Sequence, residues 1–100
     1  MARNITKRAE KIYENMMSET RIHMLRWEDA RNGNWKWAGW FGDEASMSTR
    51  VANDIVALAN SEIRQMNDLV KHGYNGEHII RCRDAAQVVK NTIEKWLEER

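Results

Sequence analysis

The 100-residue chain is predicted to be all-α, a single-domain antiparallel three-helix bundle. Apolar residues recur at intervals of three and four in three separate segments, which is the period of a helix with one buried face. The sequence contains no proline, so nothing forces a helix to break. The three segments have similar lengths, about 25 residues or roughly 38 Å each, which suits side-by-side packing.

The first helix is expected over residues 5–31. Its apolar residues, including Ile5, Met16 and Trp27, fall within one arc. His23 lies in this arc and is interpreted as a hydrogen-bonded core histidine rather than a metal ligand. The sequence SET at 18–20 is a weak point, and two shorter helices that meet there are the alternative.

The second and third helices are expected over residues 46–72 and 76–98. Heptad spacing marks both, and the second also has a neighbouring apolar row, which favours a central position for it. Gly33 or a neighbouring asparagine suits the left-handed residue after the first helix, and Gly73 suits it after the second. The short link GYNG predicts a helical hairpin. A single long hairpin that dimerises into a larger bundle is the competing architecture.

The connection between the first two helices, GNWKWAGWFGDE at residues 33–44, holds three of the five tryptophans and the only phenylalanine. It is long for a link between packed helices, where about 2–8 residues is usual. The rings either plug the open end of the bundle or form a binding loop, because tryptophan is enriched at interface hot spots. Stacking on bases or a sugar is disfavoured, because Lys36 is the one nearby cation and Asp43 and Glu44 follow it.

Apolar residues outside the predicted helix faces point to a binding surface. Ile22 and Leu25 lie on the far side of the first helix from its apolar arc, and Ile80 and Val88 lie off the seam of the third. Together with the aromatic connection, they suggest more apolar surface than one small monomer can bury. The candidate partner-binding residues are Trp35, Trp37, Trp40, Phe41, Ile22 and Leu25.

Basic residues gather at the starts of the first and third helices, which share one end of an up-down bundle. The two groups could combine into one patch for phosphates or carboxylates. The alternative, a solvated face of mixed charge, is favoured because glutamates and an aspartate are interspersed. The candidate basic patch comprises Arg3, Lys7, Arg8, Lys11, Arg81 and Arg83.

Sites for catalysis, metals or cofactors are not expected. No glutamate has the acidic or histidine partner at i+3 that helical metal sites use. His78 and Cys82 have a spacing that can present two zinc ligands, but only Glu77 or Asp84 is available to complete the set. Cys82 also lies on the core seam, where cysteine behaves as a small hydrophobe. No nucleophile motif or phosphate-binding loop occurs, so a metal-dependent enzyme is the least favoured function.

Composition and charge favour a cytoplasmic protein with no membrane segment. The first residues contain no apolar run that could serve as a signal peptide, and no run of 18 apolar residues occurs in the sequence. The single cysteine suits a reducing compartment. The formal net charge of +1 provides no general attraction for a polyanion. We expect a non-enzymatic protein that binds another protein or itself as a homodimer, for example a small inhibitor, adaptor or assembly factor, such as a phage or mobile-element accessory or counter-defence protein. A small nucleic-acid-binding module that uses the basic patch is the alternative.

Overall fold

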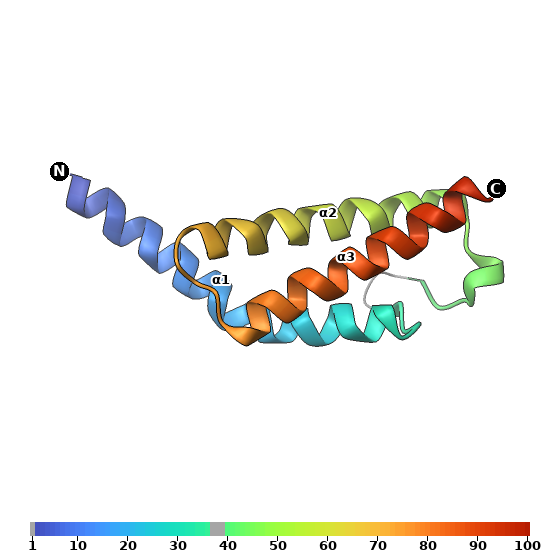
Figure 1. Cartoon of the computed structure of the whole chain (residues 1–100), viewed down its shortest axis with the longest axis horizontal. Coiled ribbons are helices and arrows are strands. Elements are labelled where there is room, and N and C mark those ends of the chain that lie inside the picture. Colours follow the sequence, from blue (N-terminus) through green and yellow to red (C-terminus); the bar gives the residue numbers. More distant parts are fainter. Residues whose placement is uncertain (1, 37–39) are drawn as a thin grey trace.

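The computed structural model describes residues 2–36 and 40–100, and over them the chain is helical without strands. It contains α1 (Ala2–Arg31), the 3-10 helix η2 (Glu44–Ser46), α2 (Thr49–Lys71) and α3 (Glu77–Glu98). Figure 1 shows the α-helices side by side along a rod, with the two termini at opposite ends. The rod measures 54 × 20 × 19 Å. The prediction of an all-helical protein with three α-helices is confirmed.

Helix α1 is continuous through residues 18–20, so the alternative of two shorter helices is wrong. The Ser18 hydroxyl donates to the Asn15 carbonyl oxygen at 2.8 Å, and the Thr20 hydroxyl donates to that of Met17 at 2.7 Å. Both hydroxyls are therefore satisfied by the preceding turn and do not interrupt the helix. Bonds of this kind often bend a helix, and α1 changes direction near its middle in Figure 1. It also begins three residues earlier than the expected residue 5.

Helix α2 begins at Thr49, three residues later than the first expected position. The preceding residue, Ser48, is the N-cap, and its side chain accepts a hydrogen bond from the Val51 amide at 3.1 Å. This bond satisfies one of the amides that a helix start leaves unpaired. Residues 44–46 form the separate helix η2 instead of the first turn of α2.

Glycines with positive φ follow two of the helices, as the sequence predicts. Gly33 follows α1 with φ of 98°, and Gly73 follows α2 with φ of 93°. After Gly73, the Tyr74 amide donates to the Leu69 carbonyl oxygen at 2.9 Å, which closes the turn onto the last turn of α2. The short turn then leads into α3, which packs closely against α2. Figure 1 shows the two helices joined at this turn, and they are called the α2–α3 hairpin below.

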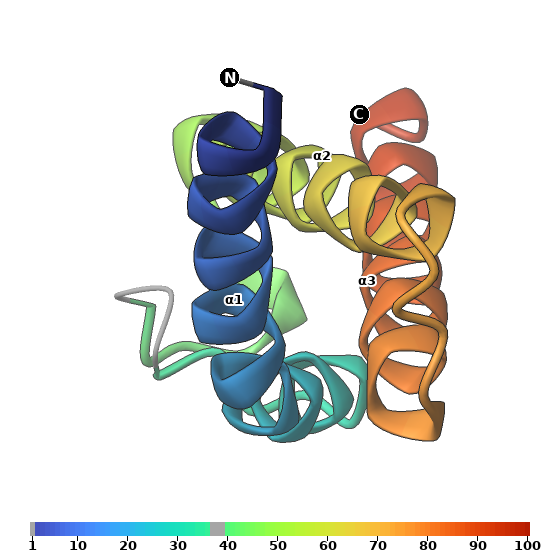
Figure 2. The same ribbon diagram turned by 90° about the vertical axis from the view of Figure 1, so that its left-hand side faces the viewer.

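The helix that packs closely against both neighbours is α3, whereas α2 was expected to be central. Ala85 and Ala86 of α3 are consecutive and buried, so the helix has short side chains on two adjacent sides. Small side chains let neighbouring helices approach. The second apolar row of α2 is also incompletely covered, since Leu58 is 43% exposed. Figure 2 views the arrangement along the rod.

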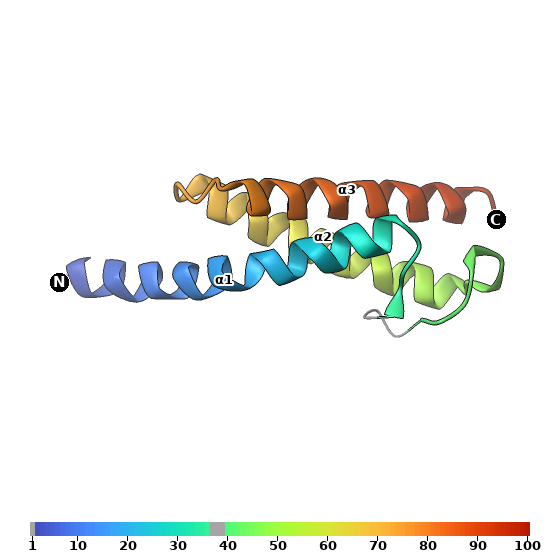
Figure 3. The same cartoon turned by 90° about the horizontal axis from the view of Figure 1, so that it is seen from below.

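The N-terminal part of α1 extends beyond the end of the α2–α3 hairpin. Tyr13 is the first residue of α1 with a described contact to the hairpin: its hydroxyl donates to Asp68 at 2.5 Å, and its ring stacks on His72 at 4.4 Å. Residues 2–12, called the overhang below, precede this contact. At about 1.5 Å per residue the overhang is roughly 17 Å long, and Figure 3 shows α1 passing the end of the hairpin.

Candidate protein-interaction surface

The Trp-rich connection is divided between the core and the surface. Trp40 is buried, with 8% of its surface exposed, and Trp35 is half-buried against the core. The two rings lie 5.8 Å apart in a tilted arrangement, which is typical of aromatic pairs. Phe41, the next residue, is 80% exposed, and Trp37 lies outside the described residues. The connection therefore supplies a ring to the core and presents another to solvent.

Local hydrogen bonds hold the chain tightly after Phe41. The Ser46 amide donates to a carboxylate oxygen of Asp43 at 3.0 Å, which caps η2. A Cβ on Gly42 would lie 2.9 Å from Nε1 of Trp40 and would also collide with the Ser46 hydroxyl. Glycine at position 42 therefore allows the backbone to pass close to the buried indole.

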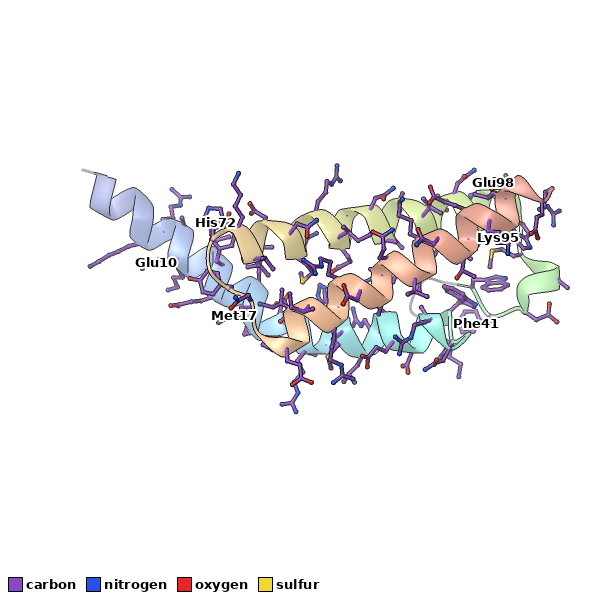
Figure 4. The ribbon with its side chains drawn as sticks, viewed as in Figure 1. Glu10, Met17, Phe41, His72, Lys95 and Glu98 are labelled. Carbon is purple, nitrogen blue, oxygen red and sulfur yellow. The ribbon has the colours of Figure 1, made fainter. Side chains whose placement is uncertain are left out.

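Ile22 and Leu25 are the exposed apolar residues of α1 away from its buried face. Each is 53% exposed, whereas Trp27, two residues further on, is 1% exposed. Their positions agree with the helical spacing in the sequence. On the other helices, Leu58 and Val88 are each 43% exposed. Phe41 comes from the connection near the end of α1, as Figure 4 shows.

A polar cluster that the sequence did not reveal joins the three helices inside the bundle. His23 Nδ1 of α1 lies 2.8 Å from Glu62 Oε1 of α2, and the Cys82 thiol of α3 donates to Glu62 Oε2 at 3.8 Å. The Glu62 side chain is only 15% exposed. It occupies a position on the buried 3-4 spacing of α2, between Ala59 and Met66. The 3-4 spacing of Ala59, Glu62 and Met66 is the signal in the sequence that could have found it.

This cluster changes the titration of two of its members. The hydrogen bond to Glu62 raises the pKa of His23 above its usual 6.5, although burial opposes the shift. Burial raises the pKa of the Cys82 thiol, and the nearby Glu62 carboxylate adds to the effect. His23 is thus a hydrogen-bonded histidine at the edge of the core, as expected, and Cys82 is a protonated core residue rather than a reactive thiol.

The candidate basic patch is divided in the structure. Arg81 makes a bidentate contact with Glu28 of α1, at 2.9 and 3.0 Å. Glu28 lies 17 residues beyond Lys11, or roughly 25 Å along the helix. Arg83 lies 3.5 Å from Asp84. Lys7, Arg8 and Lys11 are exposed on the overhang, and the side chain of Arg3 is outside the described residues.

A groove of about 530 Å³ lies between α1 and the start of α3. Met17 and Met24 provide its apolar surface, and charged groups of both signs, including Arg21 and Glu77, line the rest. The arginine from α3 in this groove, Arg81, is held by Glu28. The mixed charge gives the groove no clear preference for an anion or a cation.

Among the described residues, no set of three histidine, cysteine, aspartate or glutamate side chains is arranged to hold a metal ion. Over the same residues, no helix has both the length and the apolar character needed to cross a bilayer. No protein family model matches the sequence, and no curated protein or solved structure is significantly similar to it.

Proposed function

We propose that this protein acts by binding another protein, or a second copy of itself, and that it is not an enzyme. The observation that carries the proposal is the exposure of Ile22 and Leu25, at 53% each, on a part of α1 whose opposite face is buried at Met24 and Trp27. Complete burial of such a side chain contributes about 1.5–3 kcal/mol, and roughly half of that gain is still available here. An inhibitor, adaptor or assembly factor in the cytoplasm would use such a surface.

The proposed frame for this surface is an antiparallel bundle closed at one end by the Trp-rich connection. The close packing of α2 on α3 across a short turn and the burial of Trp40 support this arrangement. Trp40 then has a structural role, whereas the exposed ring of Phe41 is free to contact a partner. Trp35, half-buried beside Trp40, leaves only part of its side chain to contact a partner.

The test compares Leu25→Asp with the matched control Leu58→Asp on the outer side of α2. Native mass spectrometry over a range of concentrations reports self-association, and pull-down from the source cell reports other partners. We expect Leu25→Asp to weaken the association by roughly tenfold or more, as loss of a hot-spot residue does. The control should bind normally. A monomer at every concentration that captures no protein would refute the proposal, as would equal binding by both variants.

Nucleic-acid binding is the second candidate, and the exposed cations Lys7, Arg8 and Lys11 favour it. The contact of Arg81 with Glu28 weakens it, because this carboxylate neutralises one of the two arginines that α3 contributes to the patch. Binding of this kind falls steeply with salt. Retention on heparin that is lost as salt rises, together with the same dependence on duplex or single-stranded DNA, would favour this candidate over the first.

A further inference from the structure

The overhang combines an apolar stripe with a concentration of positive charge. Ile12 is 52% exposed, although it belongs to the heptad-spaced row that also contains Ala9 and Met16. Further along α1 the apolar face is covered by the rest of the bundle, where Trp27 is 1% exposed. The same face of one helix is therefore packed in one half and open in the other. Figure 4 places Glu10 on the open part, beyond the hairpin end at His72.

The charges on the overhang disfavour the helix that carries them. Four cations and one carboxylate, Glu10, lie within residues 2–12, and the first turn contains no acidic residue. Lys7 and Lys11 are four residues apart, and like charges at this spacing destabilise a helix. Isolated helices shorter than about 12 residues are also marginal in water. A partner that supplies negative charge and apolar surface would remove both disadvantages.

The positive charge of the overhang distinguishes between two partner helices: the overhang of a second copy of this chain and an acidic helix of another protein. A second overhang would bring another four cations alongside the first four, which is repulsive at such short range. An acidic helix would place carboxylates beside Lys7, Arg8 and Lys11, which are exposed. The 4-3-4 spacing of Ile5, Ala9, Ile12 and Met16 is that of a coiled-coil seam, which packs against a helix rather than against a nucleic acid.

We propose that the overhang is the docking site for an acidic amphipathic helix of another protein. That helix would pack against Ala9 and Ile12. It would cover the apolar face of the overhang as the α2–α3 hairpin covers the apolar face of the rest of α1. This inference rests on the proposed function and names the chemistry of the partner. It places the binding of this helix on the overhang, which is a separate surface from that of Ile22 and Leu25.

The experiment titrates the full chain with two synthetic peptides of about four heptads that share one leucine and isoleucine seam. One peptide carries glutamate at the flanking positions and the other carries lysine. Calorimetry should show binding of the acidic peptide only, and the binding should weaken as salt rises. Ile12→Glu and Lys11→Glu should each weaken it by roughly tenfold or more. Lys95→Glu is the matched control at the opposite end of the rod (Figure 4) and should bind normally.

Several outcomes would overturn the inference. These are failure to bind the acidic peptide, equal binding of both peptides, or equal loss in the Lys95→Glu control. Binding of a single-stranded DNA oligonucleotide or of phosphatidylserine vesicles without binding of the peptide would assign the overhang to another class of partner. Circular dichroism checks that the variants are folded. Because Ile12 is exposed, Ile12→Glu should melt at the same temperature as the parent protein. If peptide binding fails while Leu25→Asp still disrupts association, the proposed function stands without the overhang.

Discussion

Replacing Trp40 by alanine should destabilise the whole bundle, whereas the same change at Phe41 should have little effect. Trp40 is 8% exposed and contacts Trp35 across 5.8 Å, so truncation removes an indole from the core and an aromatic pair. Buried tryptophan to alanine changes cost about 3–5 kcal/mol. Because Trp40 lies in a connection that can partly collapse, we expect the lower figure, about 3 kcal/mol. Phe41 is 80% exposed, and its truncation should stay within about 0.5 kcal/mol.

Thermal melting followed by circular dichroism measures this difference. In a domain of this size, 1 kcal/mol shifts Tm by about 4–8 °C. Trp40→Ala should therefore lower Tm by about 12 °C or more, and Phe41→Ala by no more than about 4 °C. Urea titration should give the same order, with an unchanged slope. A Tm for Trp40→Ala within a few degrees of the parent protein would show that the indole does not close the core.

Three further predictions follow from the packing. Because the folded-state pKa of His23 is raised above 6.5, its pairing with Glu62 should stabilise the protein fully below pH 6.5, and this stability should be lost as pH rises through the raised value. Urea titrations at successive pH values should show that fall in the parent protein and a weaker one in His23→Gln; parallel curves would contradict the pairing. Gly42→Ala should lower Tm by several degrees, because its Cβ would lie 2.9 Å from Nε1 of Trp40; an unchanged melt would mean that the chain relaxes freely. Cys82, which is buried and has a raised pKa, should resist iodoacetamide in the native state and react in guanidinium; rapid native labelling would show that the bundle opens locally.

Much of the helical framework could be predicted because it depends on local properties of the chain. Heptad spacing and the absence of proline indicated three helices, and Gly33 and Gly73 do have the positive φ that ends the first two. The exposure of Ile22 and Leu25 also followed from spacing alone, since it depends only on which side of a helix a residue occupies. The helix starts were less accurate, because capping by Ser48 depends on the path of the preceding segment.

The candidate site required the tertiary structure. Neighbouring residues in the connection have opposite environments, since Trp40 is buried and Phe41 is exposed, and no periodicity distinguishes them in an irregular segment. The contact of Arg81 with Glu28, 53 residues away, separates two basic groups that the sequence alone could have combined into one patch.

The amino-acid sequence by itself determined that this protein is helical, that glycines with positive φ end the first two helices, and that Ile22 and Leu25 of α1 face away from the core. The tertiary structure decided that α3 packs against both neighbours, that Glu62 meets His23 and Cys82, and that α1 extends past the hairpin. The physical reason is that backbone hydrogen bonds and helical periodicity are set within a few residues. Pairings between helices depend on the shapes and charges of side chains that are distant in the chain and meet only after folding.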